Sequence, residues 1–93
     1  MITLDDCIAL CGLSEDEVLA IAEHEHIPEI AAVELGGYLL LSEKGSHTIA
    51  TMISDDIRCS MAMGERAHAI TLLHVLHEFL RKHPEASSSV MHP

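Results

Sequence analysis

Aromatic residues are almost missing from this 93-residue chain. Tyr38 and Phe79 are the only two, and tryptophan is absent, although 48% of the residues are hydrophobic. The core must therefore be built from Leu, Ile, Val, Ala and Met, which suits closely packed helices. Proteins that bind single-stranded nucleic acid stack bases on aromatic side chains, so this composition argues against that function.

Long hydrophobic runs and a disulfide framework are missing as well. A membrane-spanning helix needs about 20 predominantly apolar residues, whereas apolar stretches such as residues 18–22 are far shorter. The opening segment MITLDD lacks the basic region of a secretory signal. Three cysteines, an odd number, fit a reducing compartment. We therefore expect one small cytoplasmic domain with no membrane contact.

Basic residues do not occur before position 44. Residues 1–43 contain ten acidic residues and no Lys or Arg, whereas residues 44–93 contain five of each kind, so the first half carries the entire formal charge of −10. The first three expected helices have a spacing that resembles a helix-turn-helix. However, the helix that would enter DNA contains Glu29 and Glu34 and no cation. Phosphate binding depends on Lys and Arg, so we expect no nucleic-acid partner.

Capping signals divide the first half into short helices. Thr3 can cap a helix that ends at Cys11 before Gly12. Ser14 and Glu17 have the spacing of a capping box, and the helix that they open should end near residue 26 because Pro28 disfavours helical geometry at the residue before it. Pro28 can then begin a third helix.

The third segment, EIAAVELGGYLLL at residues 29–41, permits two interpretations. As a helix it is apolar nearly all round, which predicts a central, buried position. As a strand pair it would turn at Gly36 and Gly37. Pro28, Glu29 and the two alanines favour the helix.

Two longer helices follow a turn at residues 42–46. The first repeats Ile49, Ile53 and Ile57 at intervals of four and ends at Gly64. The second should run from Glu65 to about residue 83, where Pro84 ends it. Its apolar stripe contains Ala69, Leu72, Leu73, Leu76, Phe79 and Leu80.

These elements together predict an all-α fold. We expect a compact bundle of about five helices, three short N-terminal ones and two longer antiparallel C-terminal ones. Residues 1–84 should form a single helical domain, and residues 85–93 a flexible C-terminal tail.

Histidine and glutamate spacing suggests one possible metal site. The pattern Glu-x-x-His places two ligands on one helical face, as in di-iron carboxylate bundles. It occurs at Glu23 with His26 and at Glu65 with His68. These four residues are the candidate ligands for zinc or iron. Both pairs lie at expected helix ends, however, and two occurrences are only slightly more than chance gives.

No pattern typical of an enzyme is present. Cys7 and Cys11 share one helical face and are interpreted as small buried apolar residues. The chain contains no nucleophile elbow, phosphate-binding glycine loop or haem-attachment motif. We therefore expect a non-enzymatic protein without a catalytic or cofactor-binding site.

Residues 20–39, AIAEHEHIPEIAAVELGGYL, resemble a stretch found in small all-helical bacterial proteins. The resemblance covers about a fifth of the chain. It implies a helix rather than a hairpin for the third segment, and it implies no activity.

The function that we expect is a protein–protein interaction module that self-associates, as a dimer. A mean hydropathy of +0.26 is high for so charged a chain, and the acidic half is free to meet a basic protein partner. The dimer interface is predicted on the last helix, at Leu72, Val75, Leu76 and Phe79. The alternative function is metal binding through the four Glu and His ligands. A third is a proton-responsive module, because the chain contains eight histidines.

Overall fold

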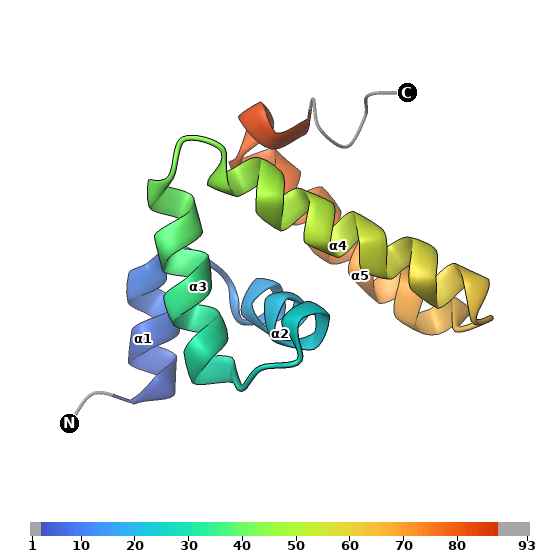
Figure 1. Cartoon of the computed structure of the whole chain (residues 1–93), viewed down its shortest axis with the longest axis horizontal. Coiled ribbons are helices and arrows are strands. Elements are labelled where there is room, and N and C mark those ends of the chain that lie inside the picture. Colours follow the sequence, from blue (N-terminus) through green and yellow to red (C-terminus); the bar gives the residue numbers. More distant parts are fainter. Residues whose placement is uncertain (1–2, 88–93) are drawn as a thin grey trace.

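A computed structural model describes residues 3–87, which fold into five α-helices and one 3-10 turn (Figure 1). The short helices α1 (Leu4–Cys11), α2 (Glu15–Glu25) and α3 (Glu29–Leu41) form one end of the molecule. The longer helices α4 (Gly45–Ala62) and α5 (Arg66–Lys82) run antiparallel beside them, followed by η1 (Pro84–Ala86). The prediction of an all-α bundle of five helices is confirmed.

The first two helices begin at the predicted caps, Thr3 and Ser14, and both caps form capping boxes. Thr3 and Asp6 exchange side chain–backbone hydrogen bonds of 3.1 Å each at the start of α1. Ser14 and Glu17 do the same at the start of α2, at 2.9 and 3.2 Å. Gly12 ends α1 with φ of 87°, a left-handed geometry that glycine adopts without strain.

The third segment is a helix, as the capping signals favoured, and not a hairpin. Its predicted central position is only partly right. Ala32, Val33 and Gly36 are buried, but Tyr38 and Leu41 are 68% and 90% exposed. One face of α3 packs against α1, α2 and α4. Among residues 3–87, no other helix covers the opposite face.

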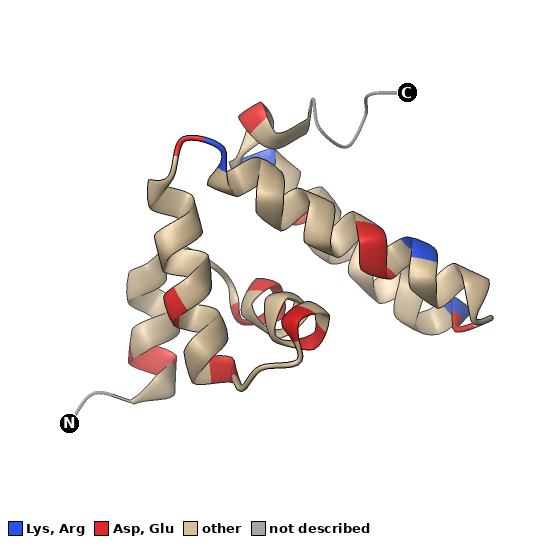
Figure 2. Ribbon diagram, viewed as in Figure 1, with Lys and Arg blue, Asp and Glu red and all other residues tan. Residues whose placement is uncertain are grey.

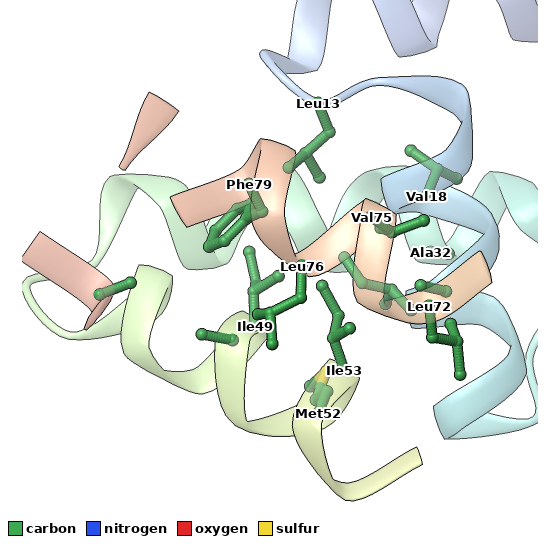
Figure 3. Close-up of a cluster of buried hydrophobic side chains, with 14 of the residues drawn as sticks. Leu13, Val18, Ala32, Ile49, Met52, Ile53, Leu72, Val75, Leu76 and Phe79 are labelled. Carbon is green, nitrogen blue, oxygen red and sulfur yellow. The ribbon is translucent and has the colours of Figure 1, made fainter. Parts of the chain in front are cut away.

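The core lies where α4 and α5 pack against each other and against α2 (Figure 3). Phe79, Ile49, Ile53, Val18 and Ile21 are almost fully buried. The predicted stripe of α5 is correct except at one position: Leu73 is 51% exposed, while Val75 faces the core. Around the helix, Val75 lies closer than Leu73 to the middle of the buried arc formed by Leu72, Leu76 and Phe79.

The end of the described chain belongs to the packed domain. Ala86 in η1 is completely buried, and η1 contacts both α4 and α5. The domain therefore extends beyond the expected limit at residue 84. The remainder of the expected tail, residues 88–93, lies outside the described residues.

Within residues 3–87, none of the helices combines the length and the apolar character that a bilayer span requires.

Candidate interaction groove

A hollow with a volume of about 600 Å³ lies between α2 and α5. The connection from α2 to α3 contributes Ile27 and Pro28 to its lining. We call this hollow the α2–α5 groove, and it is lined by Asp16, Leu19, Ala20, Ala22, Glu23, Ile27, Pro28, Glu29, His68, Thr71, Leu72 and Val75.

The groove combines an apolar surface with a one-sided charge. Most of its exposed lining is apolar, and Leu19 is 40% exposed beside it. The ionisable side chains that line it are three carboxylates, those of Asp16, Glu23 and Glu29, and the imidazole of His68. No Lys or Arg is among the lining residues. The groove therefore offers apolar contact together with an acidic rim.

Two side-chain contacts join α2 to α5 beside this groove. Glu23 Oε1 lies 2.6 Å from His68 Nε2, and Glu17 Oε1 accepts a hydrogen bond of 2.9 Å from Lys82 Nζ. Glu23 precedes the end of α2 and His68 follows the start of α5, whereas Glu17 and Lys82 lie at the opposite ends of these helices. The two contacts therefore hold α2 and α5 together in an antiparallel sense.

The Glu17 carboxylate is the most deeply buried charged group of the described residues. Its side chain is 1% exposed, and its second oxygen, Oε2, has no hydrogen-bond partner. A smaller hollow of about 350 Å³ lies beside it and shares Asp16, Thr71 and Val75 with the α2–α5 groove. Because an unpaired buried carboxylate is costly, the hydrogen bond from Lys82 stabilises this packing.

His68 has an acidic neighbourhood that favours its protonated form. The hydrogen bond to Glu23 raises the pKa of His68 above 6.5, desolvation opposes this increase, and the charges of Glu23, Glu65 and Asp56 support it. Burial raises the pKa of Asp56, whose carboxylate also faces His24, Glu23 and Asp55. Asp56 Oδ2 is buried without a hydrogen-bond partner. A group of ionisable side chains thus lies where α2, α4 and α5 meet.

The structure brings together only two of the four candidate metal ligands in direct contact. Glu23 and His68 meet across α2 and α5, but His26 is the exposed left-handed residue that ends α2, and Glu65 precedes α5 as its N-cap. Among residues 3–87 there is no group of three or more His, Cys, Asp or Glu side chains arranged to hold a metal ion.

The four residues of the expected dimer interface lie in the core. Leu72, Val75, Leu76 and Phe79 are between 0% and 8% exposed and pack within the chain. Leu72 and Val75 still reach the wall of the α2–α5 groove. The large apolar side chains that α5 exposes are instead those of Ile70 and Leu73.

Charge is distributed as the sequence indicates, with acidic residues on α1–α3 and every basic residue after α3 (Figure 2). Arg58 pairs with Asp55 on its own helix, and Arg81 pairs with Glu78 in the same way. Lys82 is the one fixed cation of the described residues that forms an ion pair with an acid of α1–α3. Most acids of the first three helices are therefore left without a fixed cation beside them.

Some groove residues could not be identified from the sequence. Asp16 and Glu29 are typical first-turn acids of their helices, and Thr71 is an exposed helix residue whose hydroxyl donates to the Ala67 carbonyl. Their common position follows only from the way α2 packs against α5. The sequence indicated Leu19 only weakly as a groove residue, because Leu19 lies beside the core-facing arc of Val18 and Ile21, which are fully buried.

Cys7 and Cys11 are half-buried against the core, and the Cys11 thiol donates to the Ile8 carbonyl, as expected for small core residues.

Comparison with protein families, with curated proteins and with solved structures gives no match to this chain.

Proposed function

We propose that this protein is a non-enzymatic protein–protein interaction module, and that its α2–α5 groove binds a basic, partly apolar segment of a partner protein. One observation carries the proposal: an apolar groove of about 600 Å³ is bordered by three carboxylates and by no Lys or Arg. We further place this module in the cytoplasm, where its cysteines would stay reduced.

The lining explains why the segment would be both basic and apolar. Burial of apolar surface stabilises a complex by about 25 cal/mol for each Å², and Leu19, Leu72 and Val75 supply such surface. The carboxylates of Asp16 and Glu29 would attract Lys or Arg and would repel acidic proteins, including other copies of this acidic chain. Such complementarity mainly increases the association rate and the specificity.

A labelled synthetic peptide tests this function. The peptide places leucines on one helical face and lysines on the other, and its affinity is measured by fluorescence anisotropy. Tight binding that weakens with added salt supports the proposal, and a peptide with glutamate in place of lysine should not bind. If the glutamate peptide bound equally well, recognition by charge would be excluded.

Matched variants locate the binding site. Thr71→Arg places a cation and extra volume in the groove and should weaken peptide binding at least tenfold. Thr48→Arg makes the same change on α4, where Thr48 is also exposed and its hydroxyl also donates to a carbonyl four residues earlier. That variant should bind as the wild type does. Equal binding by both variants would place the site elsewhere.

Self-association is a second candidate, favoured by exposed apolar side chains on α1 and α3. Leu10 on α1 is 82% exposed, and Tyr38 and Leu41 on α3 are 68% and 90% exposed. The two helices lie close together here, because a methyl group added at Gly37 of α3 would contact Cys11 of α1. These side chains are uncharged, so a second copy would meet less repulsion here than at the acidic groove. Light scattering tests this: Leu41→Lys should convert a dimer into a monomer, and a wild-type monomer at high concentration would exclude it.

A further inference from the structure

The Glu23–His68 contact occupies a carboxylate that the proposed partner needs. Both side chains line the α2–α5 groove, and their atoms Oε1 and Nε2 are 2.6 Å apart. The side chains are 48% and 36% exposed, so a bound segment can reach them. The Glu23 carboxylate can therefore contact either His68 of its own chain or a cation of a bound segment.

The surroundings of His68 supply acids from three helices. Glu23 faces it from α2, Asp56 from α4 and Glu65 from the N-cap of α5. Around Asp56 the neighbouring charged groups are Glu23, His24 and Asp55. These acids favour the imidazolium form of His68, and the hydrogen bond to Glu23 is the largest contribution. A protonated His68 then neutralises the Glu23 carboxylate.

We propose that Glu23 accepts a Lys or Arg side chain of the partner, and that the His68 imidazolium competes with this side chain for the same carboxylate. The inference rests on the proposed function of the α2–α5 groove. It adds a contact residue and a proton-linked control to that function. Asp16 and Glu29 line the same groove with no histidine in contact, so no imidazole of this chain competes with the partner for them.

Linkage fixes the direction of the effect. Binding of the partner cation to Glu23 removes the carboxylate that favours the imidazolium, so His68 releases its proton more easily in the complex. A ligand whose binding releases a proton binds more tightly as the pH rises. The affinity should therefore increase with pH while His68 titrates, by up to about tenfold for each pH unit. Lysines of the peptide, with pKa values of about 10.4, stay charged throughout.

The experiment measures binding of the leucine–lysine peptide to the folded protein between about pH 5.5 and about pH 8.5. The wild type should bind more tightly at the upper end. His68→Gln should bind with nearly the same affinity across the range, because no proton competes for Glu23. His77→Gln removes another exposed histidine of α5 that lines neither hollow, and it should keep the wild-type pH dependence.

Glu23→Gln tests the acceptor itself. This variant should bind the peptide at least threefold more weakly than the wild type above the pKa of His68. Its residual binding should also depend less on pH. In the free protein, NMR titration of the variant should show a lower pKa for His68, because its hydrogen-bonded carboxylate is gone.

The results separate this inference from the function on which it rests. Peptide binding that Thr71→Arg weakens at least tenfold but that does not vary with pH would overturn the competition and leave the groove as the binding site. The same pH dependence in His68→Gln as in the wild type would also overturn it. An absence of peptide binding at every pH would overturn both.

Discussion

Lys82 Nζ lies 2.9 Å from Glu17 Oε1 and joins the last turn of α5 to the first turn of α2. Glu17 also completes the capping box with Ser14, so one buried carboxylate fixes both the start of α2 and its position against α5. Both residues line the smaller hollow, which shares Asp16, Thr71 and Val75 with the α2–α5 groove. Four changes test how the fold is held together, and one measurement tests the groove.

Lys82→Met should destabilise the protein by about 1–3 kcal/mol. Methionine keeps much of the aliphatic stem but leaves the Glu17 carboxylate, which is 1% exposed, without its cation. Urea unfolding followed by circular dichroism measures the loss. Lys44→Met is the control, because Lys44 is exposed and forms no ion pair among residues 3–87; an equal loss in both variants would contradict a role for the Glu17 contact.

Gly45→Ala should destabilise the protein by more than about 1 kcal/mol. A Cβ atom at Gly45 would lie 1.4 Å from the carbonyl oxygen of Leu39, so the turn from α3 to α4 would have to move. Gly37→Ala is the matched control within α3, because its Cβ would make an ordinary 3.7 Å contact with Cys11. It should leave stability unchanged or increase it by up to about 1 kcal/mol. Thermal unfolding of the two variants gives the comparison.

Phe79→Ala should lower the free energy of unfolding by about 3–5 kcal/mol, because the Phe79 ring is completely buried between helices. Leu73→Ala, on the same helix but 51% exposed, should change it by less than about 0.5 kcal/mol. Denaturant midpoints distinguish the two. Comparable losses would mean that the face of α5 assigned to the core is assigned wrongly.

The fold could be predicted from the sequence because its signals are local. Capping boxes at Thr3 and Ser14, the left-handed Gly12 and the break at Gly64 depend on neighbouring residues alone. The uncertainty over residues 29–41 had a physical origin, since an apolar segment without clear periodicity suits either structure. It forms a helix, and α1, α2 and α4 cover only part of its surface.

The groove could not be predicted in the same way. Glu23 and His68 are 45 positions apart, and Glu17 and Lys82 are 65 apart. Histidine spacing did select Glu23 and His68, but as metal ligands with partners on their own helices. The contact that forms instead crosses from α2 to α5, and only the packing of the helices determines which ends of them meet.

Stability should respond to pH through His68. Because the folded-state pKa of His68 lies above 6.5, its contribution is complete below about pH 6.5 and is lost as the pH rises through the folded-state pKa. The contribution of His68 to the stability of the wild type therefore decreases as the pH rises. His68→Gln should lack that fall, whereas His77→Gln should retain it. Urea midpoints at about pH 5.5 and about pH 8.5 provide the check.

The most direct test of the groove compares the backbone amide chemical shifts of the protein, in a two-dimensional ¹H–¹⁵N correlation NMR spectrum, with and without the leucine–lysine peptide. If the α2–α5 groove binds basic, partly apolar segments, the largest shifts will fall on residues that line it, such as Leu19, Thr71 and Val75. Shifts concentrated instead around Tyr38 and Leu41, on the exposed face of α3, would contradict the account.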